Sequence, residues 1–350
     1  MTSTLRIGIA GLGRLGRRHA ENLAFRVRGC QLVSACSPVA DELDTARREL
    51  GVARLHADFD AFVRDPGIDA VVLVTPTALH ADQVIAALAA GKHVFVEKPL
   101  ALGVDDCERV ERAARAHADR IAMVGFVRRF DASYANARAH IEQGGIGRPF
   151  LVRSQTCDLL DPSGAFLKFA PSSGGIYMDC SVHDIDLARW MLGSPRATRV
   201  FASGTIAVHD ELAAIGDVDN GLAIVEFDGG ARAVFYASRT FAHGHETQTE
   251  VIGTAGKLLV GAGAARDRLQ IADTHGVRQL SVADFFERFR DAFLCEMQAF
   301  VDACSGRRPL ALTLNDATEA TRIGQAITRS LQSGQPESIQ AGAARSATES

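Results

Sequence analysis

The stretch Arg6-Ile7-Gly8-Ile9-Ala10-Gly11-Leu12-Gly13-Arg14-Leu15-Gly16 decides the fold of the N-terminal part of the chain. It joins a short apolar run to a Gly-x-Gly-x-x-Gly fingerprint, and a stretch of helix-forming residues follows. Glycines at such a junction let backbone N–H groups approach a pyrophosphate, and the N-terminus of the following helix favours its charge. The alternative is a glycine-rich turn without a ligand. The context predicts a dinucleotide site that includes Gly11, Gly13, Arg14, Leu15 and Gly16.

Apolar runs alternate with helix-like stretches along the first third of the chain. After the run at 6–10, further runs occupy residues 31–35, 70–74, 93–96 and 121–125. Continuous apolar runs that alternate with helices are typical of a parallel sheet covered on both faces. The sequence therefore predicts an α/β fold whose residues 1–124 form a Rossmann domain, with a doubly wound parallel sheet.

The pattern changes after Phe126. Short strand candidates recur on tight turns, and Asp228-Gly229-Gly230 predicts a hairpin between two of them. Many adjacent strands on short connections favour an antiparallel sheet. Residues 125–335 are therefore expected to form an α+β domain with a large open, mostly antiparallel sheet, closed by helices at 285–304 and 316–333. Residues 336–350 are small and polar, which predicts a disordered tail.

Composition and charge narrow the class of protein. A length of 350 residues fits two domains, and a formal charge of -4 argues against a nucleic-acid partner. No apolar run reaches the roughly 20 residues of a membrane helix, and a strand-like run follows the N-terminus too closely for a signal peptide. Seven cysteines without a C-x-x-C pair predict thiols in a cytoplasmic protein. His243 and His245 lack further ligands at zinc spacing, so no metal is expected.

The end of the second predicted strand bears on the choice of cofactor. Ser37 stands where an acidic residue would bond the ribose 2′-hydroxyl of NAD. Arg14 lies inside the glycine loop, and a guanidinium beside a small hydroxyl suits a 2′-phosphate. The sequence thus favours NADP over NAD. If Arg14 points to solvent instead, the site would accept either cofactor.

Two polar motifs follow the next strands of the predicted sheet, where parallel strands present their carboxyl ends to a ligand crevice. They are Thr75-Pro76-Thr77 with His80, and Glu97-Lys98-Pro99. Together with the fingerprint, their order and spacing resemble the Gfo/Idh/MocA family of glucose-fructose oxidoreductases and inositol dehydrogenases. The resemblance covers most of the chain. It implies that the cofactor site also includes Ser37, Thr75, Pro76, Thr77, His80, Glu97 and Lys98.

A segment of the second half carries the catalytic part of the resemblance. Residues 174–184 resemble the family's G-G-x-x-x-D-x-x-x-H-D segment, which implies a catalytic set of Lys98, Asp179 and His183. An apolar stripe predicts a helix over 178–192, on which Asp179 and His183 share a face. A histidine beside a carboxylate accepts a hydroxyl proton near neutral pH, and Lys98 supplies positive charge to a developing alkoxide. Alternatively, Asp179 and His183 form only a pair on the helix surface, and Lys98 is a solvated lysine at the end of a strand.

Polyol recognition needs donors and acceptors for several ring hydroxyls. The substrate candidates are Lys98, Arg128, Asp158, Asp179, His183 and His245, with Asp161 and His243 as further candidates. Alternatively, Arg128 forms an ion pair at the domain interface, and His243 and His245 are loop histidines. Asp184 and Asp186 are expected to be structural or solvated. The segments around Asp158 and His245 depart from those of inositol dehydrogenases, which leaves a cyclitol or a sugar as the expected substrate.

These features predict an NAD(P)-dependent dehydrogenase that oxidises a secondary hydroxyl of a cyclitol or sugar. One alternative is a lyase, epimerase or glycosidase of the same fold that oxidises its substrate only transiently. Another is a cofactor-sensing regulator without catalysis, which would need none of Lys98, Asp179 and His183. The resemblance also implies a homodimer or homotetramer formed through the free face of the second sheet.

Overall fold

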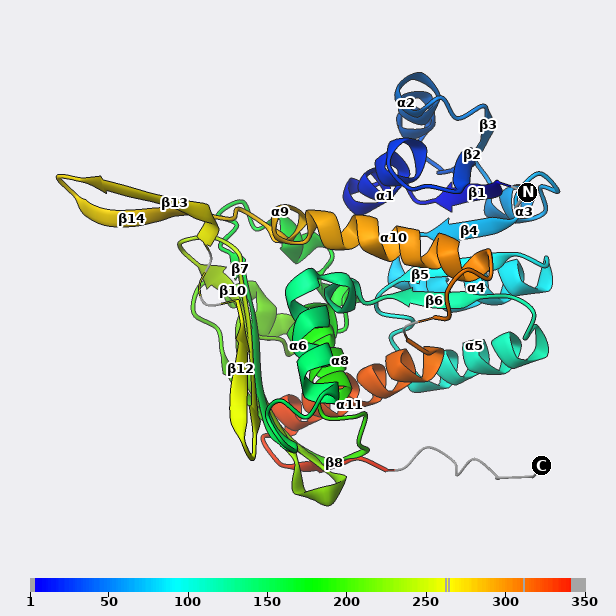
Figure 1. The fold of residues 1–350 in the computed structure, drawn as a ribbon. Helices are drawn as coiled ribbons and strands as arrows, with labels where there is room; N and C mark the ends of the chain where they lie inside the picture. The colour runs from blue at the N-terminus through cyan, green and yellow to red at the C-terminus, as the bar shows by residue number, and fades with distance from the viewer. Residues whose placement is uncertain (1–3, 262, 264, 311, 341–350) are drawn as a thin grey trace. The chain divides into compact units, whose positions relative to one another are not determined.

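The computed structural model describes residues 4–261, 263, 265–310 and 312–340 (Figure 1). The chain divides into two compact units, and each is built from two separate stretches of sequence. The first unit combines Met1–Ala132 with Phe289–Thr321, and the second combines Ser133–Arg288 with Arg322–Ser350. This division differs from the sequence-based one, which assigned residues 289–321 to the second domain. No helix in the described ranges is long and apolar enough to span a membrane.

The first unit contains a six-stranded sheet in the order β3-β2-β1-β4-β5-β6. All its neighbouring strands pair in parallel. The order is that of a dinucleotide-binding Rossmann fold, which confirms the predicted doubly wound sheet. The sequence analysis missed only the three-residue edge strand, because it is not an apolar run. The strands are β1 (Leu5–Ala10), β2 (Cys30–Cys36), β3 (Arg54–His56), β4 (Ala70–Leu73), β5 (His93–Glu97) and β6 (Ala122–Gly125).

A helix from late in the sequence belongs to this first unit. The ring of Phe300 lies 5.8 Å from that of Phe95 in β5, and the ring of Phe293 lies 5.5 Å from that of His19 in α1. The predicted helix at 285–304 is in fact interrupted at Phe289, giving a short α9 and the long α10. The helices of this unit are α1 (Arg14–Phe25), α2 (Ala40–Leu50), α3 (Phe59–Val63), α4 (Thr77–Ala89), α5 (Val104–Ala116) and α10 (Arg290–Cys304), with the 3-10 turn η1 (Val127–Phe130); α9 (Phe285–Arg288) belongs to the second unit.

The second unit contains a seven-stranded sheet in the order β12-β11-β7-β10-β9-β8-β15. The pair β7 and β10 is parallel and the other pairings are antiparallel, which confirms the predicted sheet. Its strands are β7 (Pro149–Leu159), β8 (Ala197–Thr205), β9 (Asn220–Phe227), β10 (Arg232–Phe241), β11 (Glu246–Gly253), β12 (Gly256–Val260) and β15 (Glu337–Ser338). A separate two-stranded hairpin consists of β13 (Ala265–Asp273) and β14 (Gly276–Ser281).

Two further predictions concern this sheet, namely a hairpin at residues 228–230 and a disordered tail at residues 336–350. The predicted hairpin at 228–230 is confirmed: Phe227 donates its N–H to the carbonyl of Ala231, and Gly229 and Gly230 have φ values of 75° and 86°. The expected disorder of residues 336–350 does not hold for β15, which pairs with β8. Residues 341–350 lie outside the described part of the chain.

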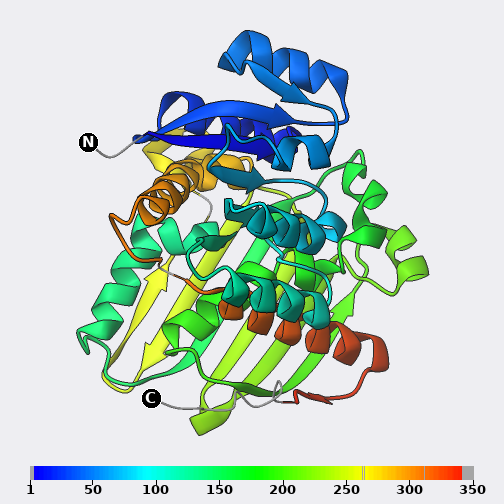
Figure 2. The ribbon, with the colours of Figure 1, turned by 90° about the vertical axis from the view of Figure 1, so that its right-hand side faces the viewer.

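Helices cover one face of the second sheet. Figure 1 shows α6 (Ala132–Glu142) and α8 (Val182–Met191) on one side of the strands, and Figure 2 shows the orange-red end of α11 (Leu314–Ser333) crossing them. Asp184 of α8 is buried and accepts hydrogen bonds from the hydroxyls of Ser154 and Thr156 in β7, both at 2.6 Å. This anchors α8 to the sheet and confirms the structural role expected for Asp184.

Candidate active site

Each of the three glycines of the fingerprint suits its position for a different structural reason. A Cβ on Gly11, which has a φ of +87°, would lie 2.4 Å from the carbonyl oxygen of Val74, and one on Gly16 would lie 2.0 Å from that of Gly11. A Cβ on Gly13, the N-cap of α1, would meet nothing within 4 Å. A tight turn, an open backbone and close helix–strand packing are the roles that a dinucleotide fingerprint assigns to its glycines in this order. The loop therefore fits the pyrophosphate of a dinucleotide at Gly13 and the N-terminus of α1.

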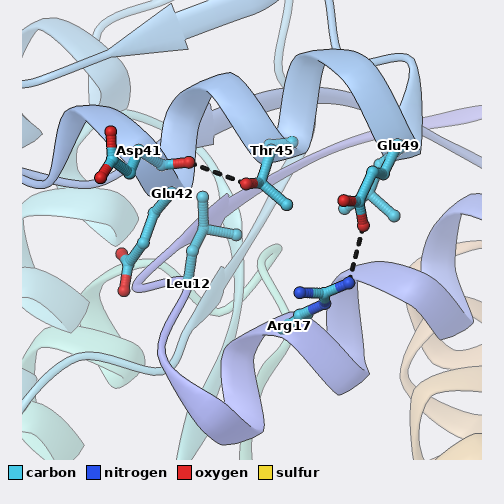
Figure 3. Close-up of a pocket in the computed structure, with 8 residues that line it drawn as sticks. Leu12, Arg17, Asp41, Glu42, Thr45 and Glu49 are labelled. Atoms are coloured by element: carbon cyan, nitrogen blue, oxygen red, sulfur yellow. Dashed lines mark hydrogen bonds and ion pairs between the residues drawn. The ribbon is translucent and has the colours of Figure 1, made fainter.

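The environment of Ser37, at the end of β2, is acidic. Its hydroxyl is buried and donates a 2.5 Å hydrogen bond to Glu42, while it accepts one from the N–H of Val39. Glu42 also lines a pocket between α1 and α2, together with Asp41 and Glu49 (Figure 3). Arg17 of α1 also lines this pocket, and its guanidinium forms a 2.6 Å ion pair with Glu49. Arg14 itself is exposed as the first residue of α1.

The loops after β4 and β5 are tied together by His80. Its Nε2 lies 2.8 Å from the carbonyl oxygen of Thr75 and its Nδ1 lies 2.8 Å from that of Pro99. The side chain is only 1% exposed, and burial lowers its pKa. Pro76 is exposed as the N-cap of α4, whose first residue is Thr77. His80 thus shapes the loop from beneath, while residues 75–77 form its surface.

Lys98 directly follows β5 and is half-buried. Its backbone N–H donates to Oε2 of Glu97 at 3.2 Å, and Oε1 of Glu97 lies 2.7 Å from Nε2 of His19. The Glu97 carboxylate therefore points into the buried interior of the first unit. Arg128, in η1, is 3% exposed, and its guanidinium lies 5.5 Å from the ring centre of Phe289 within the same unit.

In the second unit, polar side chains gather at one end of the helix-covered face of the sheet. Asp158 continues the buried series of Val152, Ser154 and Thr156 along β7. Because Thr247 of β11 pairs with Thr156, the next inward position on each strand brings His245 opposite Asp158. Nδ1 of His245 lies 2.9 Å from Oδ1 of Asp158. These two candidates, 87 residues apart in the chain, are thus brought together as neighbours.

The cluster also contains Arg239, which the sequence analysis missed. Its guanidinium is 6% exposed, donates to Oδ2 of Asp179 at 3.0 Å and lies 4.9 Å from the ring centre of Phe166. A signal was present in the sequence, because Arg239 continues the alternating inward series of Ala233, Phe235 and Ala237 on β10. An arginine at such a position requires a buried anionic partner.

The segment that carries Asp179 and His183 is not the single helix that the apolar stripe predicts. Asp179 ends the short α7 (Ile176–Asp179), whereas His183 is the second residue of α8. The N–H of Ser181 reaches back to the carbonyl of Ile176 at 3.3 Å, one residue farther than in an α-helix. His183 is half-buried, and Asp186 is 1% exposed, so Asp186 is not solvated.

Electrostatics keep Asp158 ionised. Burial alone would raise its pKa, but the hydrogen bond and charge of His245, together with the charge of Arg239, lower it below the ordinary 3.8. Burial opposes the charge of Arg239, yet the neighbouring Cys180, Asp179 and Asp158 raise its pKa overall. Carboxylates held by a histidine and an arginine offer several acceptors and donors at one place, as recognition of adjacent hydroxyls requires.

The two further candidates, Asp161 and His243, make local contacts of their own. Asp161 accepts the backbone N–H groups of Ser163 and Ala165, both at 2.9 Å, and so closes a turn. His243 is exposed, and its Nε2 lies 3.4 Å from Glu246. The alternative of a loop histidine therefore holds for His243 but not for His245.

Comparison with known protein families finds a match for each half of the chain. Residues 5–126 match the family described as "Oxidoreductase family, NAD-binding Rossmann fold", and residues 134–259 match the "GFO/IDH/MocA C-terminal domain". The scyllo-inositol 2-dehydrogenase (NAD(+)) of Bacillus subtilis (strain 168) is 38% identical over 337 residues, covering 96% of each chain.

Solved structures show the same similarity. The scyllo-inositol dehydrogenase of Lactobacillus casei, solved with NAD(H) and scyllo-inositol, is 36% identical with a TM-score of 0.93, and the match covers 96% of this chain and 99% of that one. The myo-inositol 2-dehydrogenase of Lactobacillus plantarum is 34% identical with a TM-score of 0.93, covering 97% and 100%. The protein described here therefore belongs to the GFO/IDH/MocA oxidoreductase family, with its NAD-binding Rossmann fold.

Proposed function

We propose that the protein oxidises a secondary ring hydroxyl of an inositol, with NAD as the hydride acceptor. The observation that carries the proposal is the polar cluster of the second unit, where Asp158, Asp179, Arg239 and His245 meet at the end of the covered sheet face. Such a cluster satisfies adjacent hydroxyls once water has left them. Two relatives over nearly the whole chain are named for inositol oxidation, and a related structure contains NAD(H) with scyllo-inositol.

The catalytic roles of His183, Asp179 and Lys98 follow from the chemistry of their side chains, and Arg239 positions Asp179. His183 takes the proton of the reacting hydroxyl, and Asp179 stabilises the imidazolium that forms. Arg239 fixes the Asp179 carboxylate through their 3.0 Å hydrogen bond. Lys98 places a positive charge beside the oxygen as it gains alkoxide character. Bound NAD would supply the acceptor for the hydride that leaves the substrate carbon.

We assign the cofactor site to the glycine loop, with Gly11, Gly13, Arg14, Leu15 and Gly16, and to the loops after β2, β4 and β5. NAD is proposed over NADP because the Ser37 hydroxyl is held by Glu42, and a carboxylate there repels a 2′-phosphate. Glu42 thus takes the part that the sequence analysis sought at position 37. A Glu42→Gln variant should bind NADP more tightly relative to NAD, and an unchanged ratio of kcat/KM values would contradict the assignment.

The substrate is tested with a panel of cyclitols and aldoses under both cofactors. We expect reduction of NAD with scyllo- or myo-inositol and a kcat/KM at least tenfold lower with glucose or xylose. Rapid reduction with an aldose and none with an inositol would move the proposal to the sugar branch of the family. Substrate conversion without net reduction of NAD would instead identify a lyase or an epimerase.

We further propose a homodimer or homotetramer formed through the outer face of the second sheet. Large apolar side chains stand there on adjacent strands: Phe201 is 42%, Leu222 is 56% and Ile224 is 46% exposed. Phe201 and Ile224 are direct cross-strand partners, so the patch is continuous. Light scattering should give a multiple of the chain mass, and Ile224→Glu should lower it; a monomeric wild type would contradict the proposal.

A further inference from the structure

Three ionisable side chains meet in the interior of the first unit, beneath the strand end that carries Lys98. They are His19 of α1, Glu97 of β5 and Glu296 of α10, and their exposed fractions are 0%, 5% and 0%. One nitrogen or oxygen atom of each lies within 4.8 Å of those of the other two. Glu296 occupies a core position of α10, flanked on the same buried stripe by Phe293 and Phe300. A charged residue type at such a position is seldom buried without a specific role.

The surroundings of these three side chains are apolar. The ring of His19 lies 5.6 Å from that of Phe95 and 5.5 Å from that of Phe293. Neither carboxylate oxygen of Glu296 has a hydrogen-bond partner among the described residues. Two ionised carboxylates at this separation in such an enclosure repel each other and lose their hydration. Burial and the charge of Glu97 accordingly raise the pKa of Glu296 well above its ordinary 4.5.

The position of Glu97 depends on contacts that leave it little freedom. One oxygen lies 2.7 Å from Nε2 of His19, and the other accepts the backbone N–H of Lys98. Its carboxylate also lies against Gly125 of the neighbouring strand, where a Cβ would come within 3.0 Å of Oε2. Whatever fixes the Glu97 carboxylate therefore fixes the backbone at Lys98.

We propose that His19, Glu97 and a protonated Glu296 form a buried triad that holds Lys98 in place, with His19 and Glu296 as positioning residues. The neutral Glu296 leaves Glu97 as the single negative charge of the triad. That charge is held between His19 and the backbone of Lys98. The inference rests on the proposed function only for the role of Lys98; the protonation of Glu296 is independent of any substrate.

The elements packed against α10 determine which groups can influence this proton. The first helix contributes His19 and β5 contributes Glu97, while η1 contributes Arg128 at Phe289 and Arg129, which lies 3.5 Å from Asp316. Because the pKa of Glu296 is raised on folding, the folded chain holds a proton that the unfolded chain releases above pH 4.5. The resulting stability is complete below that value and is lost as the pH rises toward the folded pKa.

The first test measures this proton without any substrate. Glu296→Gln keeps the shape but has no proton to release, so the ratio of wild-type to variant unfolding constants should rise with pH, by up to about tenfold per pH unit. A difference infrared spectrum of wild type against Glu296→Gln should show the carbonyl band of a protonated acid. Absence of the band together with a pH-independent ratio would overturn the protonation.

The second test measures positioning. Glu296→Met fills a similar volume but removes the polar head that lies within 4.8 Å of His19 and Glu97. We expect a kcat about 10- to 100-fold lower, because a small misplacement of a catalytic group costs that much. Glu296→Gln should restore most of it, and the KM for NAD should stay constant. Met297→Leu, on the next buried position of α10, is the packing control. Equal kcat in Glu296→Met and Met297→Leu would refute the positioning role.

A bound divalent ion is the competing explanation for this arrangement of side chains, because histidine and glutamate can bind such ions. Stoichiometric metal in the purified protein, lost in Glu296→Gln, would overturn the triad as described. If inositol oxidation itself fails, the unfolding and infrared measurements still decide the protonation of Glu296, so the two failures are distinguishable.

Discussion

The two glycines Gly13 and Gly16 give a matched pair of substitutions in one loop. Alanine at Gly16 would place its Cβ 2.0 Å from the carbonyl oxygen of Gly11, whereas an ordinary C···O contact is about 3.3 Å. The loop would have to move by about 1 Å, although the N–H of Gly11 is bonded to Cys36 at 2.9 Å. We expect Gly16→Ala to lose about 1–3 kcal/mol of folding free energy.

Alanine at Gly13 meets no atom within 4 Å, and the backbone there has a φ of -62° that alanine adopts readily. Gly13→Ala should therefore fold with wild-type stability, within about 0.5 kcal/mol. The added methyl group lies where the pyrophosphate approaches the backbone, so NAD binding should weaken about tenfold, or about 1.4 kcal/mol.

Urea unfolding with and without NAD measures both effects. At a concentration of 100 times the wild-type Kd, NAD should stabilise the wild type by about 2.7 kcal/mol and Gly13→Ala by about 1.4 kcal/mol. Equal destabilisation of the two variants without NAD, or undiminished stabilisation of Gly13→Ala by NAD, would refute this account of the loop.

Three further predictions concern the second unit. Arg239→Met should destabilise the protein by about 3 kcal/mol, because it removes the buried cation that neutralises the carboxylates of Asp179 and Asp158. Asp179→Asn in the same background should recover part of that loss in a urea titration. His183→Ala should lower kcat about 10²–10⁴-fold while leaving the Kd of NAD unchanged; activity within a few-fold of wild type would remove its role as the base. Because the pKa of Asp158 is lowered, its contribution to stability is present above 3.8 and is lost as the pH falls through the folded value, so His245→Gln should flatten the acid side of the stability curve.

The fold of the first unit is predictable from the sequence because its signals are local. The apolar run, the glycine fingerprint and the helix that follows lie within one short stretch, and the strand order of the sheet agrees with them. The contribution of α10 was missed because the helix joins the first unit from residues 290–304, and no local pattern shows which sheet a distant helix covers. Glu296 was overlooked for the same reason.

The same contrast between local signals and distant contacts holds for the site residues. Asp158 and His245 were identified by residue type, and the register of β7 and β11 explains why they meet. Arg239 was missed, although it stands on the inward side of β10, because the alternation of that strand was not followed beyond Ala237. The choice of NADP rested on Ser37 and Arg14, whereas the carboxylate that holds the Ser37 hydroxyl belongs to Glu42, five residues farther along on α2. Side-chain partners of this kind depend on rotamers that sequence spacing does not specify.

The most direct test of the proposed function is the fate of the hydrogen on the oxidised carbon. Inositol deuterated at its ring carbons, incubated with NAD and the purified protein, should yield one deuterated NADH for each molecule of ketone, with a slower rate than the unlabelled substrate. Lys98→Met and His183→Ala should each lower the formation of both products together by at least about 10²-fold while still binding NAD. Conversion of inositol without accumulation of deuterated NADH, or full activity in either variant, would contradict the dehydrogenase mechanism.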